Sequence, residues 1–354
     1  MPLLPTEPIG SVPRPAYLLE AMSAFNNNQI SQTEFDAIMN RALQETITAF
    51  EESGSPIITD GEQSKPSFAT YPIAGLSGLK PNGVVIPFED GHTRQLPVIS
   101  EGPFKYSTLA SSFLKHAQGF TNCAIKQAII SPSALSLLYP ADGIEGYSRE
   151  EFLTDLINEA EKEIRQCLDL GAHNVQIDFT EARLAIKLDP SKQLLQAFID
   201  LNNQVLDRFI PEEQAKIGIH SCPGGDHDST HSADVSYEDL LPYLFALHAG
   251  NFYLEYAAEA NKPVVLEAIK KSIKPNQRVF LGVTNVLNPR IETPEEIRDL
   301  ILDAAKVIPV EQLGTTDDCG FSPFADDVST AREIAFAKIK ARIEGTALAN
   351  EQLS

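Results

Sequence analysis

Residues 148–179 read SREEFLTDLINEAEKEIRQCLDLGAHNVQIDF, and this stretch shows the pattern that decides the fold class. Ser148 is placed to cap a helix, with Glu151 three residues later in capping-box spacing, and Gly171 marks the end of that helix. The run HNVQIDF follows at once, and it is short and largely apolar, as in a parallel strand that is covered on both faces. A helix followed directly by such a strand favours an α/β fold.

The same alternation recurs along the chain. Further helices are predicted at 31–54, 293–308 and 329–345, with caps at Ser31 and Thr293. Eight short apolar segments are candidate strands: 6–12, 55–62, 125–131, 173–179, 215–221, 250–256, 278–284 and 311–318. Eight such alternations, with no GxGxxG phosphate loop, favour a (β/α)8 TIM-type barrel over a doubly wound sheet. We expect one barrel domain over residues 1–354, with an inserted β-hairpin near residues 83–104 that turns at Asp90-Gly91.

Composition excludes several classes of partner. The net charge of −21 repels phosphate backbones, so nucleic-acid binding is not expected. No segment has the length and apolarity of a transmembrane helix, and the first residues lack the pattern of a signal peptide. The four cysteines lie far apart and form no disulfide framework. We therefore expect a cytoplasmic protein that has no membrane partner.

Polar side chains close the predicted strands. In a barrel these residues point into the mouth at the carboxyl ends of the strands, where chemistry takes place. They are Ser11, Glu62, Ser131, Asp178, His220 with Cys222, Glu255, Asn285 and Cys319.

One short segment, GIHSCPGGDHDSTHSAD (218–234), is unusually rich in potential metal ligands. His220 and Cys222 are two residues apart on an extended backbone, so both can face one ion. If the barrel closes, Glu255 and Cys319 converge on them, and this set of donors suits zinc. The pattern alone leaves metal binding and simple core packing open.

The rest of that segment has two interpretations. Asp226, His227, Asp228 and His231 follow strong turn signals, and they can form either a second metal site or a mobile loop near the mouth. We favour the loop. Glu181 and Arg183, after the strand that ends at Asp178, are equally compatible with substrate binding and with ion pairing on a helix.

Seven motifs in order resemble the carboxy-terminal catalytic domain of cobalamin-independent methionine synthase, a zinc-dependent barrel that methylates homocysteine. They are IGSVPRP (9–15), TDGE (59–62), VQID (175–178), IHSC (219–222), YLEYA (253–257), LGVTNVLNPRIETPEEI (281–297) and DDCGF (317–321). The resemblance implies a zinc site formed by His220, Cys222, Glu255 and Cys319. It also implies that Ile9, Gly10, Ser11, Glu62 and Asp178 contact homocysteine, with Glu62 and Asp178 as the catalytic carboxylates.

Three departures from the family concern the methyl donor. The family places a histidine, thought to protonate the departing folate nitrogen, where this chain has Leu287, and leucine supplies no proton. The family stacks the pterin on a tryptophan, and this chain has none. The family's additional amino-terminal barrel has no counterpart in this sequence. We therefore predict that the donor is not ordinary methyl-tetrahydrofolate but a methyl-corrinoid protein or an uncharacterised compound.

Two alternatives remain open at this point. The chain can be a zinc-dependent alkyltransferase for another thiol, of the epoxide–thiol transferase type. It can also be a non-catalytic accessory protein that binds a metal or a methyl group. Because Leu287 removes the family's acid, His227 or His231 in the loop is a candidate proton donor.

Overall fold

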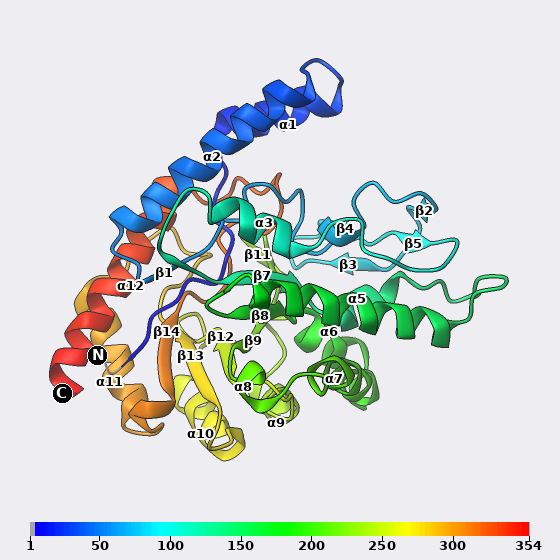
Figure 1. The fold of residues 1–354 in the computed structure, drawn as a ribbon. Helices are drawn as coiled ribbons and strands as arrows, with labels where there is room; N and C mark the ends of the chain where they lie inside the picture. The colour runs from blue at the N-terminus through cyan, green and yellow to red at the C-terminus, as the bar shows by residue number, and fades with distance from the viewer. Residues whose placement is uncertain (1–3, 354) are drawn as a thin grey trace.

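A parallel sheet of six strands forms most of the barrel wall in the computed structural model, which describes residues 4–353 (Figure 1). The strands follow the order β14-β13-β12-β9-β8-β7. Their bounds are β7 (Gln127–Ile130), β8 (Val175–Asp178), β9 (Ile217–Ser221), β12 (Asn251–Leu254), β13 (Arg278–Gly282) and β14 (Leu313–Thr316). Apart from Arg278 at the start of β13, which is half-buried, every residue of these strands is buried, as a sheet inside a ring of helices requires.

Two further segments close the ring between β14 and β7. Thr6 pairs in parallel with Thr315, and the amide of Glu7 donates to the Thr315 carbonyl at 3.0 Å. On the other side β1 (Ile57–Ile58) pairs with β6 (Ala124–Ile125), which continues into β7 after Lys126. The Val12 amide donates to the Gly61 carbonyl at 3.1 Å and so links the two segments. The structure therefore confirms the predicted (β/α)8 barrel.

The predicted strand at 6–12 is wrong as a regular strand, because it contributes only one bridge pair to the ring. Pro5 and Pro8 flank that bridge, and neither residue has an N–H to donate to a neighbouring strand. The chain is thus held by isolated backbone bonds and not by a continuous ladder.

Helices surround the barrel (Figure 1). The bounds of the longer ones are α1 (Ala16–Asn26), α2 (Gln32–Glu52), α3 (Ala110–Ala117), α5 (Arg149–Asp169), α6 (Glu181–Leu188), α7 (Gln193–Leu206), α9 (Tyr237–Leu244), α10 (Lys262–Ser272), α11 (Pro294–Ala305) and α12 (Arg332–Leu353). Single turns form α4 (Pro132–Leu135) and α8 (Pro211–Gln214), and 3-10 turns form η1 (Tyr71–Ile73), η2 (Ser136–Leu138) and η3 (Val310–Gln312). The predicted caps at Ser31, Ser148 and Thr293 are all present, and each forms a capping box.

Helix α12 is longer than predicted, because Gly345 lies inside it and does not end it. A β-carbon on Gly345 would lie 2.5 Å from Cγ2 of Ile297 and 2.8 Å from the Pro294 carbonyl oxygen. The glycine is therefore required for the close packing of α12 against α11, and it has no role as a helix cap.

The predicted β-hairpin is confirmed as part of a larger excursion. β3 (Val85–Pro87) pairs antiparallel with β4 (Thr93–Gln95), and β2 (Leu79–Lys80) pairs antiparallel with β5 (Val98–Ile99). Figure 1 shows these strands to one side of the barrel. We call residues 79–99 the excursion. A second short hairpin, β10 (Gly225–Asp226) with β11 (Ser229–Thr230), follows β9.

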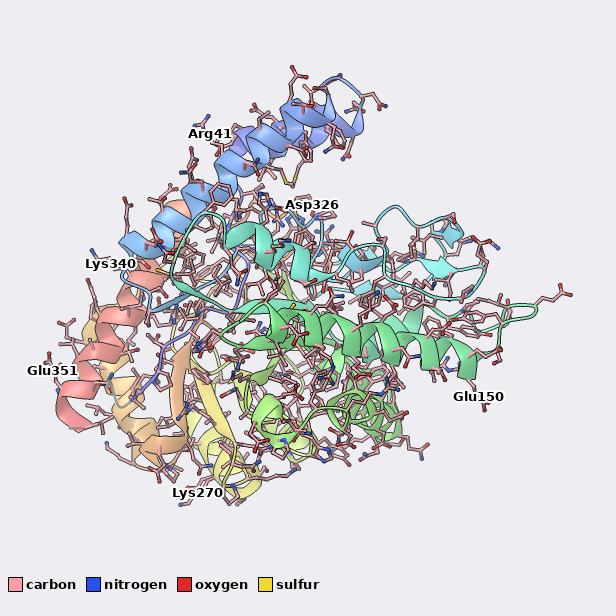
Figure 2. The ribbon with its side chains drawn as sticks, viewed as in Figure 1. Arg41, Glu150, Lys270, Asp326, Lys340 and Glu351 are labelled. Carbon is pink, nitrogen blue, oxygen red and sulfur yellow. The ribbon has the colours of Figure 1, made fainter. Side chains whose placement is uncertain are left out.

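Charged side chains lie on the outside of the molecule. Figure 2 shows Arg41, Glu150, Lys270 and Lys340 at its periphery, and all four are exposed. Among residues 4–353, no helix combines the length and apolarity that crossing a membrane requires.

Candidate metal and thiol site

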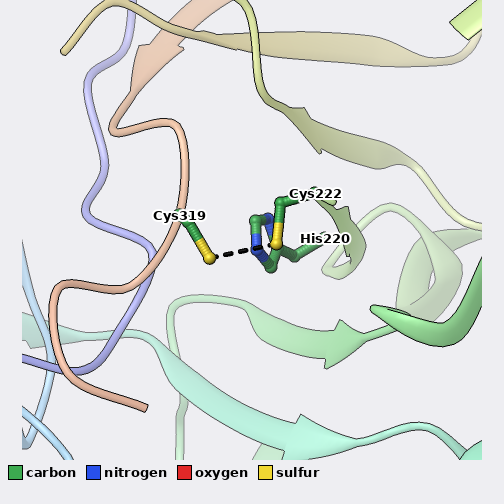
Figure 3. A group of neighbouring side chains, drawn as sticks. All are labelled: His220, Cys222 and Cys319. Atoms are coloured by element: carbon green, nitrogen blue, oxygen red, sulfur yellow. Dashed lines mark hydrogen bonds between the residues drawn. The ribbon is translucent and has the colours of Figure 1, made fainter. Parts of the chain in front are cut away.

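Three predicted ligands meet at the carboxyl ends of β9 and β14. His220 lies in β9, Cys222 follows that strand, and Cys319 lies three residues beyond β14. The Sγ atoms of Cys222 and Cys319 are 3.0 Å apart, and the ligand atoms of all three residues lie within 4.8 Å of one another (Figure 3). Both cysteines are free thiols. Barrel closure thus brings together residues that are 97 positions apart in sequence.

The histidine is oriented as a metal ligand would be. Nδ1 of His220 lies 3.3 Å from the carbonyl oxygen of Tyr253 on the neighbouring strand β12, so it is placed to donate its proton there. Nε2 is buried and has no hydrogen-bond partner within the described part of the chain. A buried acceptor without a partner is costly, and a cation would satisfy it. One imidazole nitrogen and two thiolate sulfurs fit zinc.

The thiol pair carries a shared negative charge beside His220. The pKa of Cys222 lies well below its ordinary value, because the Cys319 thiol donates a hydrogen bond to it and His220 is adjacent. Burial lowers the pKa of His220, but the charge of Cys222, a hydrogen bond with it and the charge of Asp178 together outweigh this effect, and the net direction is upward. The group therefore attracts positive charge.

Glu255 lies beside this group and is not one of its three close members. It follows β12, and its Oε2 accepts a hydrogen bond from Nη1 of Arg183 at 3.1 Å. Glu255 and Cys319 line a common small cavity, which also contains Asn285 and Leu287. The Glu255 side chain therefore approaches the sulfur pair from one side, with Arg183 holding one of its oxygens.

The residues predicted to contact homocysteine line one small cavity together with the three ligands. They are Ile9, Gly10, Ser11, Glu62 and Asp178. The cavity measures about 30 Å³, which is the volume of about one water molecule. The cavity adjoins a chamber of about 560 Å³, with which it shares Phe68, Thr180, Gly224 and Gly225.

Both carboxyl groups in the small cavity are deeply buried. Burial raises the pKa of Glu62 to about 7, against the opposing charge of Lys65, whose Nζ is 3.3 Å from Oε1 of Glu62. Burial also raises the pKa of Asp178, which accepts a hydrogen bond from Gln176 at 2.7 Å. Glu62 has a φ of 56°, a conformation that costs non-glycine residues about 1 kcal/mol or more. Strained backbone conformations of this kind cluster at active sites and ligand-binding segments.

The segment after Cys222 contains a short β-hairpin and is not the loop that we expected. Asp226 is buried, forms an ion pair with Arg94 of the excursion and lies 3.1 Å from Nε2 of His92. His227 and Asp228 form the turn, with φ angles of 48° and 58°. Asp226, His227 and Asp327 lie within 4.8 Å of one another, but Arg94 already neutralises Asp226. His231 is buried as well.

Glu181 and Arg183 are buried and do not lie on the outer face of a helix. Glu181 accepts hydrogen bonds from Ser131 at 2.6 Å and Ser133 at 2.5 Å. Arg183 pairs with Glu255 and with Glu259. The first residue therefore belongs to the chamber wall, and the second supports a predicted ligand.

Sequence reasoning missed three supporting residues. Asp318 accepts hydrogen bonds from the amides of residues 256–258, each at 2.8 Å, and so fixes the chain after Glu255. Tyr237 donates to the Ser221 carbonyl and accepts from the Glu255 amide. Lys65 bridges Glu62 and the Ala128 carbonyl. Asp318 adjoins a predicted ligand in sequence, which is a usable signal, but Tyr237 and Lys65 carry none.

Comparisons with known proteins identify the family of this chain. The family model described as "Cobalamin-independent synthase, Catalytic domain" matches residues 4–335. A methionine synthase of Sulfurisphaera tokodaii is 24% identical over 353 residues, with 100% of this chain and 94% of the relative covered. One from Thermococcus kodakarensis is 24% identical, with 100% and 96% covered.

Two solved structures share the fold. A B12-independent methionine synthase from Shewanella sp. W3-18-1, in complex with selenomethionine, has a TM-score of 0.77 at 19% identity, with 99% of this chain and 98% of that chain covered. A putative vitamin-B12-independent methionine synthase from Listeria monocytogenes has a TM-score of 0.72 at 24% identity, with 96% of each chain covered. The family match over residues 4–335 shows that this chain belongs to the cobalamin-independent methionine synthase family, whose catalytic domain it matches.

Proposed function

We propose that this chain forms one catalytic barrel that transfers a methyl group to the thiol of homocysteine in a zinc-dependent reaction that produces methionine. The observation that carries the proposal is the buried His220, Cys222 and Cys319 group, which opens into the same cavity as Glu62 and Asp178. A site for a soft metal therefore adjoins two carboxyl groups that suit an ammonium group. The methionine synthases that resemble this chain support the choice of homocysteine.

The metal would be held by His220, Cys222 and Cys319, with Glu255 as the fourth ligand. Arg183 orients Glu255 through Oε2 and leaves its other oxygen for the metal. When bound, zinc would favour the thiolate form of a substrate thiol at neutral pH, and the thiolate is the nucleophile.

The chain's own residues would orient the amino acid. Glu62 and Asp178 would bind the substrate ammonium, whose charge would return both groups to the carboxylate form. Ile9, Gly10 and Ser11, which line the same cavity, would also contact the substrate. Their combined effect is to align the thiol for displacement at a methyl carbon.

The donor side differs from a site that protonates folate. Leu287 lines a second cavity, together with Cys319 and Glu255, and its side chain carries no transferable proton. The chain also lacks tryptophan for stacking a pterin. We therefore propose that the donor is not ordinary methyl-tetrahydrofolate and is either a methyl-corrinoid or another methylated compound.

An assay with purified, zinc-loaded protein tests the proposal. Homocysteine would be offered with methyl-tetrahydrofolate, with methylcobalamin and with small N- and O-methylated aromatic compounds, and methionine would be measured. We expect methionine from a donor other than methyl-tetrahydrofolate. Efficient turnover of methyl-tetrahydrofolate would contradict the donor assignment. Alkylation of a different thiol in preference to homocysteine would instead favour the epoxide–thiol transferase alternative.

A further inference from the structure

The chamber of about 560 Å³ adjoins the small cavity lined by His220, Cys222 and Cys319, which we call the thiol cavity. The chamber is largely apolar, and its volume is within the range of sites for small molecules. Val84, Ile86 and Leu96 of the excursion form one wall, and Leu184 and Phe198 from α6 and α7 form another. The chamber shares four lining residues with the thiol cavity, so a molecule inside it lies next to the sulfur ligands.

One ionisable group in the chamber wall has an incomplete set of partners. Glu181 is 6% exposed, and its Oε2 has no hydrogen-bond partner among residues 4–353. Its Oε1, in contrast, accepts hydrogen bonds from the hydroxyls of Ser131 and Ser133. Oε1 is therefore satisfied and Oε2 is not.

The surrounding bonds determine where a proton on Glu181 would lie. Nδ2 of Asn202 donates to Oγ of Ser133 at 2.9 Å, and the Ala134 amide donates to Oγ of Ser131 at 3.1 Å. Oγ of Ser133 also lies 3.3 Å from Oγ of Ser131, but the shorter distances of 2.5 and 2.6 Å to Oε1 of Glu181 direct both hydroxyl hydrogens at that oxygen. Because Oε1 already receives two donors, the proton of a neutral Glu181 belongs on Oε2.

Burial favours that neutral form. It raises the pKa of Glu181 to about 7, against the two serine hydrogen bonds, and the charge of Asp178 acts in the same direction as burial. The other charged or titratable groups of the chamber wall are Arg94, Asp326 and His231. Arg94 and Asp326 pair with each other. Burial lowers the pKa of His231 to about 4, so this histidine is neutral near pH 7 and is not the acid of the loop hypothesis.

We propose that the chamber is the methyl-donor site and that Glu181 supplies the proton that the leaving group requires. The inference rests on the proposed methyl transfer and specifies its donor side. The thiolate sulfur forms a bond to the methyl carbon, and the bond from that carbon to a nitrogen or oxygen atom breaks. The electron pair stays on that atom, which takes the proton from Oε2 of Glu181. Solvent then returns a proton to the Glu181 carboxylate.

The walls define the chemical class of the donor. Apolar residues and a neutral acid fit a small, uncharged aromatic or heteroaromatic molecule that carries an N- or O-methyl group. A net charge of −21 disfavours a polyanionic tail. A protein-borne corrinoid needs no proton on its departing cobalt, so it would leave Glu181 without a role.

Two probes of the same shape test this assignment without turnover. Quinoline and naphthalene are both flat and neutral, but only quinoline has a ring nitrogen that accepts a hydrogen bond. We expect the wild-type protein to bind quinoline about 2- to 10-fold more tightly than naphthalene, the effect of one net hydrogen bond. Glu181→Leu should abolish this preference. Glu181→Gln should keep it, because the amide N–H would face the chamber while the amide oxygen accepts from the two serines.

Infrared difference spectra of the wild-type protein give a second readout that does not depend on the variants folding. About one pH unit below the Glu181 pKa of about 7, quinoline should shift the carbonyl stretch of a neutral carboxylic acid, and naphthalene should not. Glu163→Gln is the matched control, because Glu163 is also buried with a pKa of about 7 but does not line the chamber. This variant should lose its own band and keep the response to quinoline.

Equal affinity for the two probes in the wild-type protein, or an unchanged preference in Glu181→Leu, would overturn the proposal. A preference that depends on Glu181, in a protein that does not methylate homocysteine, would support the chamber assignment and show that the acceptor assignment is wrong. The two proposals can therefore fail separately.

Discussion

At the scale of single residues, burial sets the charge of several acids, and Glu163 shows the effect apart from the site. It is fully buried on α5, and it accepts hydrogen bonds from the Ala110 amide at 2.7 Å and the Tyr71 hydroxyl at 2.9 Å. Burial raises its pKa from 4.5 to about 7. The folded protein therefore holds a proton that the unfolded chain releases above pH 4.5, and folding stability decreases as the pH rises from there to about 7.

Replacing Glu163 with glutamine should reduce this pH dependence. The amide keeps an acceptor oxygen for Ala110 and Tyr71 but never becomes charged. The difference between 4.5 and about 7 corresponds to about 3 kcal/mol, so the free energy of unfolding of Glu163→Gln should decrease by about that much less over this pH range. Urea unfolding at several pH values measures it. Glu150→Gln on the same helix, at an exposed position, is the control and should follow the wild-type curve.

Single residues also show what sequence can predict about the site. The sequence predicts that the side chains of His220 and Cys222 face the same point, because the alternation of side chains along a strand is a local property. Glu255 was identifiable as a strand end, but its bond to Arg183 joins two elements that are 72 residues apart. Nothing in the local pattern predicts such a partner.

At the scale of elements, the β10–β11 hairpin is joined to the excursion by an ion pair between the half-buried Arg94 and the buried Asp226. Asp226 is fully buried and accepts a hydrogen bond from Nη2 of Arg94 at 3.0 Å, and the Glu89 amide donates to the Thr230 carbonyl at 3.0 Å. The turn signals in the sequence were correct, but they could not show that the turn belongs to a hairpin. That outcome depends on Arg94, which lies 132 residues away.

The Arg94→Met variant should release this hairpin. Methionine keeps an unbranched apolar side chain but removes the guanidinium that pairs with Asp226 and lies over Phe324. The buried Asp226 charge then loses its main partner, at a cost of about 3 kcal/mol. We expect faster hydrogen exchange in residues 225–230 and 85–95. Arg41→Met removes an exposed helix pair with Glu45 and should leave both segments unchanged. Unchanged exchange in Arg94→Met would show that the hairpin is held by other contacts.

At the scale of the whole molecule, the barrel could be predicted because seven of the eight segments that form its wall have the sequence pattern of a strand. The remaining segment, at 6–12, lies next to β14 in the barrel wall but precedes every other element in sequence. Its prolines prevent a regular ladder of hydrogen bonds. Closure also creates the chamber, whose walls come from the excursion, from α6 and from α7. The sequence therefore predicts the His220, Cys222 and Cys319 group from local motifs, whereas the chamber that we propose for the donor appears only in the assembled fold.

Closure of the barrel brings His220, Cys222 and Cys319 together, and we propose that they form a zinc site. The most direct test is the zinc content per chain of purified protein by elemental analysis. We expect one zinc in the wild-type protein and in Cys123→Ala, whose cysteine lies elsewhere in the fold, and a loss of zinc in Cys222→Ala and Cys319→Ala. Full zinc content in Cys319→Ala, or none in the wild-type protein, would contradict the account.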